Sequence, residues 1–172
     1  MASIINQLGL CSRVPYHFLY YSLSFGGIAF YSYFVSPILN KTLSKEEYGK
    51  VQAKVFPCFF GFQIISPLLL AAFSPFKFCP FKAGLLALAS IAGCLNLCFL
   101  KPKCHALREE ESKLAATGKD KKANGEPSEE MQTVSSCFCK CHALSTVVNA
   151  LSVVSLAVYG LTLARGLSKM KY

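Results

Sequence analysis

No charged side chain interrupts the 20 residues VFPCFFGFQIISPLLLAAFS at positions 55–74. A helix of about 20 apolar residues crosses the ~30 Å hydrocarbon core of a bilayer. Three more stretches of this kind lie between widely separated charges: 27 uncharged residues between Arg13 and Lys41, 18 between Lys82 and Lys101, and 24 between Lys140 and Arg165. The sequence therefore predicts four transmembrane helices, at about 16–36, 55–74, 83–100 and 144–164.

The composition supports a lipid environment. Of the 172 residues, 53% are hydrophobic and only 16% are charged, whereas soluble domains carry about 25% charged residues. A soluble helical bundle would need polar outer faces, but Leu68, Leu69 and Leu70 already cover most of a helix circumference with apolar side chains. We expect an all-α bundle of four transmembrane helices, forming a single domain over residues 1–172. Such a bundle leaves little chain for a catalytic module.

The distribution of Lys and Arg predicts the orientation. Loops 37–54 and 101–143 together carry twelve of these residues, and the rest of the chain carries six. By the positive-inside rule the two loops face the cytoplasm, and both termini are lumenal or extracellular. All nine acidic residues lie in the same two loops, so net charge alone favours the opposite orientation, but Asp and Glu influence insertion little. We expect an integral membrane protein of the secretory or endomembrane system.

The two longer loops have local structure of their own. Ser44 and Glu47 form a capping box, which predicts a helix start leading into the second span. Pro102 is suited to open a helix over about 103–117. Residues 118–136, GKDKKANGEPSEEMQTVSS, hold almost no large apolar side chains and are predicted to form a flexible loop.

Polar residues within the spans are few and uncharged. The absence of Asp, Glu, Lys and Arg at membrane depth argues against a proton-driven pump, and scattered Ser, Asn and Gln favour helix packing. Pro57 and Pro67 are expected to kink the second span and open a polar gap near Gln63. A small-solute path between spans one, two and four would be lined by Ser22, Gln63, Ser66 and Asn149.

Thiols cluster at one membrane boundary. Cys137, Cys139 and Cys141 precede His142 at the start of the fourth span, and Cys104 follows the third span on the same side. Three interpretations remain open: inert thiols, S-acylation of the juxtamembrane Cys137, Cys139 and Cys141, or binding of Cu(I) or Zn(II) by these thiols with His142. No cofactor is predicted.

Three blocks of sequence carry a family resemblance. Their shared positions are Gly49, Gln52, Lys54 and Pro57 before the second span, Asn96 and Pro102 around the end of the third, and His142, Ser145 and Asn149 entering the fourth, with a looser match at His17. Together they resemble the transmembrane protein 205-like family, which is also catalogued as a domain of unknown function.

The resemblance implies a four-span membrane protein, in agreement with the charge gaps. No enzymatic activity is established for that family as a whole. Its architecture is distantly similar to membrane proteins associated with copper resistance, which leaves a metal-linked role open. The Cys-x-Cys-x-Cys element lies outside the shared blocks, so any function that depends on it would be particular to this chain.

These observations lead to two hypotheses of different kinds. The first is a non-enzymatic organiser or adaptor that acts through helix packing in the lipid bilayer and through loop 101–143, which would contact a membrane or cytoplasmic partner. The alternative is a small-solute or copper-like metal-ion transporter or resistance protein. No nucleophile with an orienting base and no phosphate-binding loop is apparent in the sequence, so we expect no enzyme. We expect no nucleic-acid partner, and the oligomeric state stays open.

Overall fold

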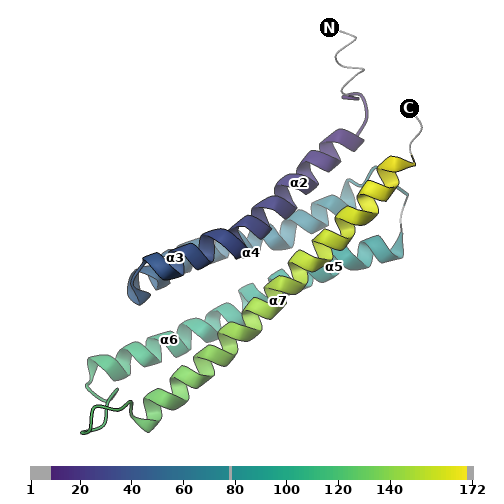
Figure 1. Ribbon diagram of the computed structural model, residues 1–172. Helices are drawn as coiled ribbons and strands as arrows, with labels where there is room; N and C mark the ends of the chain where they lie inside the picture. The colour runs from purple at the N-terminus through teal and green to yellow at the C-terminus, as the bar shows by residue number, and fades with distance from the viewer. Residues whose placement is uncertain (1–8, 78, 170–172) are drawn as a thin grey trace.

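The computed structural model describes residues 9–77 and 79–169, and these residues are mostly helical (Figure 1). Three elements, α2, η1 and α3, follow one another without a break, and so do α5, η2 and α6. The elements are α2 (Val14–Phe30), η1 (Tyr31–Val35), α3 (Ser36–Thr42), α4 (Lys45–Ala72), α5 (Pro80–Leu95), η2 (Asn96–Leu100), α6 (Lys101–Ala116) and α7 (Glu129–Ser168).

Among the described residues, four helical segments are long and apolar enough to cross a membrane. They cover Val14–Thr42, Lys45–Ala72, Pro80–Ala116 and Glu129–Ser168. Each contains one of the predicted spans, except that the second helix ends at Ala72, two residues before the predicted end at 74. The prediction of an all-α protein with four candidate membrane spans is confirmed.

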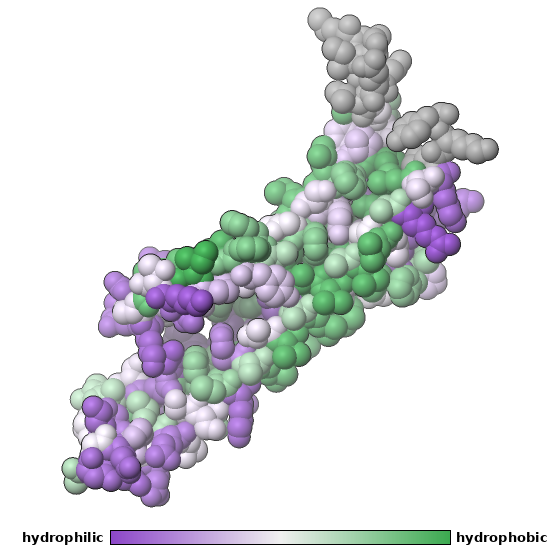
Figure 2. Space-filling model, in the orientation of Figure 1, coloured by the Kyte–Doolittle hydropathy of each residue, from purple (hydrophilic) through white to green (hydrophobic). Residues whose placement is uncertain are grey.

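The outside of the bundle is apolar and much of its inside is polar. Leu68, Phe73 and Val154 expose more than half of their surface, and Figure 2 shows hydrophobic residues along the length of the bundle. In contrast, Gln63 and Asn96 are fully buried. This arrangement suits lipid, because an apolar surface of this size would be unfavourable in water.

Helix packing brings the four segments together in a definite order. α5 packs against both α4 and α7, and α2 packs against α4 and α7 as well. The contact between α4 and α5 is close at Gly93, where an added Cβ would lie 2.9 Å from Cγ1 of Ile64. Small residues at such positions let membrane helices approach each other.

Two π-helical segments interrupt the spans, and each ends two residues before a proline. η1 precedes Pro37, and η2 precedes Pro102. At the end of each, a backbone N–H donates to the carbonyl five residues earlier: Ser36 to Tyr31, and Lys101 to Asn96. Proline lacks an N–H and its ring presses on the preceding turn, so a wider turn accommodates it without ending the helix.

Side-chain caps fix two helix starts. The predicted capping box at α4 is confirmed, because the backbone N–H of Ser44 donates to Oε2 of Glu47 at 3.0 Å, and that of Glu47 donates to Oγ of Ser44 at 3.3 Å. At α7 the N–H of Met131 donates to Oγ of Ser128 at 3.1 Å.

The expected flexible loop at 118–136 needs a correction, because its second half is helical. α7 begins at Glu129, so residues 129–136 belong to that helix. The Ser128 cap and the acidic residues Glu129 and Glu130 in the first turn stabilise this start. The remaining part, 118–128, contains turns and one isolated bridge between Lys121 and Pro127.

One part of the fold extends beyond the other helices. α6, the loop 117–128 and residues 129–143 of α7 form an antiparallel pair that we call the hairpin, and α6 packs on α7. Figure 1 shows the hairpin reaching past α3 and the start of α4, at the end of the bundle opposite the first turn of α2 and the last turn of α7. Figure 2 shows mainly hydrophilic residues on it.

Candidate functional site

Polar side chains from three segments meet inside the bundle. We call this group the polar seam; it consists of Ser24, Ser32, Gln63, Ser66 and Asn149. Nε2 of Gln63 donates to Oδ1 of Asn149 at 2.9 Å, and Nδ2 of Asn149 donates to Oγ of Ser32 at 2.8 Å. The hydroxyl of Ser66 donates to that of Ser24. The seam therefore links the first, second and fourth spans.

The predicted solute path agrees with the seam at three of its four positions. Gln63, Ser66 and Asn149 are brought together, but Ser22 is exposed and donates to the carbonyl of Phe18 in its own helix. Its place is taken by Ser24, because residues two apart in an α-helix point to nearly opposite sides. The sequence did not distinguish these two serines.

A second polar contact lies between the third and fourth spans. Oγ of Ser145 donates to Oδ1 of Asn96 at 2.7 Å. Among the described residues, Oε1 of Gln63 and Nδ2 of Asn96 are the buried side-chain polar atoms without a hydrogen-bond partner. One is an acceptor and the other a donor, and leaving such a group unpaired costs about 1–3 kcal/mol. The bundle interior can therefore accept one more hydrogen bond and donate another to neutral polar groups.

Hydrogen bonds also connect residues near both ends of the first span to other helices. Near its start, Nε2 of His17 lies 2.8 Å from Oη of Tyr159. Near its end, Oη of Tyr31 donates to Oε1 of Gln52 at 2.9 Å, and Nε2 of Gln52 donates to Oγ of Ser36 at 3.3 Å. The side chains of His17 and Gln52, both noted for the family resemblance, therefore join different helices.

The clustered cysteines point in different directions. Cys137 and Cys139 are exposed, whereas Cys141 is buried against Cys104, with 2.6 Å between the two Sγ atoms. Burial raises the pKa of Cys104 to about 12, and the contact with Cys141 adds to this effect. The structure thus places one of the three candidate thiols in the hairpin interior and leaves two on its surface.

His142 stacks on a neighbouring aromatic ring. Its ring and that of Phe138 are parallel within 5°, with centroids 6.0 Å apart, and the guanidinium of Arg108 lies 4.3 Å from the centroid of the Phe138 ring. Within residues 9–77 and 79–169, no group of three or more His, Cys, Asp or Glu side chains is arranged to hold a metal ion. The candidate ligands Cys137, Cys139, Cys141 and His142 are not assembled into such a group.

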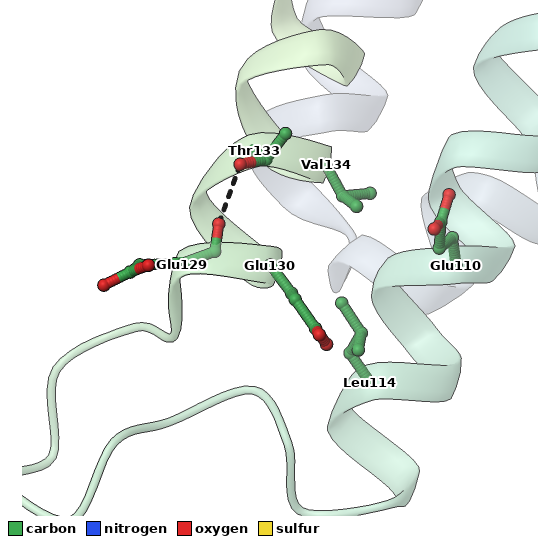
Figure 3. A pocket seen from close by; sticks show the side chains of 6 residues that line it. All are labelled: Glu110, Leu114, Glu129, Glu130, Thr133 and Val134. Atoms are coloured by element: carbon green, nitrogen blue, oxygen red, sulfur yellow. Dashed lines mark hydrogen bonds between the residues drawn. The ribbon is translucent and has the colours of Figure 1, made fainter.

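In the part of the chain that the structure describes, two open clefts lie along α6. One, of about 360 Å³, lies between α6 and α7 and is lined by Glu110, Leu114, Glu129, Glu130, Thr133 and Val134. Figure 3 shows that its three carboxylates point in different directions, with the Thr133 hydroxyl bonded to the Glu129 carbonyl at 2.8 Å. The other, of about 520 Å³, is lined by Ala53, Leu97, Lys101, Pro102, His105, Ala106 and Glu109.

The chemistry available in the seam is that of neutral hydrogen bonding. Its hydroxyls and carboxamides donate and accept without carrying charge, so they orient helices against one another or bind neutral polar groups. Because charged side chains are absent from the seam, charged solutes would have to leave water without a counter-charge, which is costly. The sequence did not foresee Tyr159 or Tyr31 as partners, since neither lies in a recognisable motif.

Comparison with known proteins assigns the chain to a family. "Xanthocillin biosynthesis cluster protein D" of Aspergillus fumigatus is 27% identical over 160 residues, an alignment that covers 90% of each chain. No solved structure matches the chain significantly. Residues 19–113, more than half of the 172, match the family model described as "Domain of unknown function (DUF4149)". The chain therefore belongs to the DUF4149 family.

Proposed function

We propose that the protein is a non-enzymatic membrane organiser or adaptor whose hairpin docks a partner outside the bilayer. The observation that carries this proposal is the continuation of two spans into the hairpin: α5, η2 and α6 form one helical segment, and α7 is continuous over 40 residues. A docking element built this way moves with the bundle and holds its partner in a fixed orientation.

Contacts within the hairpin support its rigidity. Nη1 of Arg108 lies 2.6 Å from Oε2 of Glu111, which is 8% exposed, and the same guanidinium lies over Phe138 of α7. One arginine thus makes an ion pair on its own helix and a cation–π contact across to the other. Because the Glu111 side chain is largely buried and that of Arg108 is 37% exposed, these contacts are partly shielded from water and stronger than those between fully exposed side chains.

The surface of the hairpin supplies polar groups for a partner. Lys103, Lys113 and Lys140 are exposed, as are Glu109 and Glu110. Inside the transmembrane bundle, in contrast, most polar side chains are hydrogen-bonded to other groups of the chain. The hydrogen bonds from Gln63 to Asn149 and from Asn149 to Ser32 are examples. This division favours a packed anchor in the lipid and an interaction surface outside it.

We also infer that, within its family, the chain is of the transmembrane protein 205-like type and resides in an endomembrane. The motif residues support the first part of this inference, because Asn96 with Ser145 and Gln52 with Tyr31 form interhelical hydrogen bonds. The predicted orientation has the hairpin in the cytoplasm. Glycosylation acceptors inserted at Gly118–Pro127 should stay unmodified and one after Ser168 should be modified; the reverse pattern would invert the orientation.

The adaptor role is tested by neutralising lysines on the hairpin. The variant combines Lys103→Gln, Lys113→Gln and Lys140→Gln, and its control combines Lys41→Gln, Lys45→Gln and Lys54→Gln, which are exposed on the same membrane side. In native gels of digitonin extracts, the wild type should migrate with an apparent mass well above that of a single 18.8 kDa chain with its bound digitonin. The hairpin variant should lose this complex and the control should keep it. A wild type that migrates as the free chain would contradict the adaptor role, as would equal behaviour of the two variants.

A second candidate, a small-solute transporter, is favoured by the unpartnered Oε1 of Gln63 and Nδ2 of Asn96. The name of the Aspergillus relative links that protein to xanthocillin biosynthesis, which supports a small organic solute more than a metal ion for this chain. A neutral solute flux into vesicles that the Gln63→Leu variant abolishes would favour transport over the adaptor role. An unchanged flux in this variant would count against the seam as a path.

A further inference from the structure

Two thiols meet where the hairpin leaves the bundle. Cys104 lies near the start of α6 and Cys141 lies on α7, and their Sγ atoms are 2.6 Å apart. Sγ of Cys141 also lies 3.6 Å from the carbonyl oxygen of Leu100 at the end of η2. A bonded pair of sulfurs is about 2.05 Å apart, so only a small shift separates this contact from a covalent bond.

The surrounding contacts hold the two sulfurs in register. Toward the membrane, Ser145 donates to Asn96 at 2.7 Å; Ser145 is about one turn from Cys141, and Asn96 is about two turns from Cys104. In the opposite direction, about one turn from the thiols, Arg108 of α6 lies over the ring of Phe138 of α7. Because contacts on both sides of the thiol pair already join the two helical segments, they need not slide or rotate for the sulfurs to bond.

We propose that Cys104 and Cys141 are a redox-responsive pair: the reducing cytosol, where the predicted orientation puts the hairpin, keeps them as thiols, and exchange with a low-molecular-weight disulfide such as oxidised glutathione converts them to a disulfide. The partly exposed Cys104 thiolate attacks oxidised glutathione, forms a mixed disulfide and releases one reduced glutathione. The Cys141 thiolate then attacks Sγ of Cys104 and releases the second. Two cysteine thiols are oxidised, one glutathione disulfide is reduced to two thiols, and no other reactant is needed.

The pair is distinguished from the other thiols of the same segment. Cys137 and Cys139 also lie on α7, but both are exposed, whereas Cys141 retains only 6% of its surface. Cys104 and Cys141 lie on two antiparallel helices, and the bond closes a loop of 36 intervening residues. Closing a loop of this length restricts the unfolded chain and thereby stabilises the hairpin.

The rate of the reaction follows from the surroundings of Cys104. Burial raises the pKa of its thiol to about 12, so only a small fraction is thiolate at neutral pH. Thiolate is the attacking species, and bond formation should therefore accelerate as the pH rises from 7 to 9. Once formed, the disulfide links α6 covalently to the fourth span, whether or not a partner docks on the hairpin.

Mass spectrometry of the oxidised protein detects the disulfide directly. The full chain in detergent micelles is incubated with oxidised glutathione at pH 8.5, quenched with acid, blocked with N-ethylmaleimide and digested without reductant for mass spectrometry. We expect one dominant cross-link, between the peptides of Cys104 and Cys141, that dithiothreitol removes. The oxidised protein should also unfold at a higher temperature than the reduced protein.

Matched variants complete the test. Cys104→Ser and Cys141→Ser should each abolish the cross-link, and the double change Cys137→Ser with Cys139→Ser should leave it intact. Three results would overturn the proposal: all nine cysteines remain open to N-ethylmaleimide after oxidation, glutathione stays attached to Cys104, or the cross-links are spread over Cys137 and Cys139. A failure of the digitonin complex in the adaptor test would leave these outcomes unaffected.

Discussion

Gly160 of α7 faces the phenol ring of Tyr21 of α2, and a Cβ at position 160 would overlap the hydroxyl of that ring. This hydroxyl donates to the carbonyl of Leu156 at 3.1 Å. In an α-helix the same carbonyl accepts from the backbone N–H four residues later, which is that of Gly160. The missing side chain at 160 therefore lets a tyrosine of the first span reach the backbone of the fourth.

Gly160→Ala should displace Tyr21 and weaken the contact between α2 and α7. We expect a loss of about 1–3 kcal/mol in the free energy of unfolding, typical of overpacking, seen as a lower unfolding temperature in detergent. Gly84→Ala is the matched control, because a Cβ at 84 meets nothing within 4 Å. Equal unfolding temperatures of the two variants would show that the first and fourth spans do not pack at this point.

Asn149→Leu should destabilise the bundle more than Gln63→Leu. The first change leaves Nε2 of Gln63 without its acceptor, at a cost of about 1–3 kcal/mol. It also removes the bond that Oγ of Ser32 accepts, although the Ser32 hydroxyl still donates to the carbonyl of Ile28 at 2.7 Å. The second change removes one hydrogen bond but also removes the unpartnered Oε1 of Gln63, so part of its cost is offset. Unfolding in mixed detergent micelles measures both, with the exposed Ser22→Ala as control; the opposite order would contradict the hydrogen bonds of the seam.

Cys79 and Cys104 should differ strongly in reactivity. The backbone N–H of Lys82 lowers the pKa of the Cys79 thiol, whereas burial raises that of Cys104. More Cys79 than Cys104 is thiolate at neutral pH, and alkylation by iodoacetamide should be faster at Cys79. Site-resolved mass spectrometry over time gives both rates. Faster labelling of Cys104 would mean that its thiol is not buried against Cys141.

S-acylation, if it occurs at the hairpin, should involve Cys137 and Cys139 and spare Cys141. The first two are exposed near the membrane boundary, and the third is buried. We expect a hydroxylamine-sensitive palmitate label in cells that falls in Cys137→Ser and in Cys139→Ser but not in Cys141→Ser. Label lost only in Cys141→Ser would contradict the burial of that thiol.

The sequence determined the spans because their signal is local. Charge gaps and the Ser44 capping box depend on neighbours along the chain, and the structure has helices at those places. The π segments were missed, although Pro37 and Pro102 mark both of them. A proline predicts a disturbance of the preceding turn, but whether the helix kinks, ends or widens depends on how the next helix packs.

The candidate site was only partly accessible from the sequence, because it depends on pairs far apart in the chain. Gln63 and Asn149 were singled out separately, and the structure joins them across 86 positions. Ser22 could not be separated from Ser24, since the rotation of α2 about its axis is set by contacts with α4 and α7. The pairing of Cys141 with Cys104, and not with its neighbours Cys137 and Cys139, required the register of the two antiparallel helices.

The central claim is that the four long apolar helices lie in a lipid bilayer, with exposed side chains such as Leu161 facing acyl chains. Washing membranes from expressing cells with alkaline sodium carbonate tests it most directly. Carbonate strips proteins bound to the membrane surface but leaves spanning helices in place. We predict that the chain stays in the membrane pellet and is released only by detergent. Recovery of the chain in the carbonate supernatant would contradict the account.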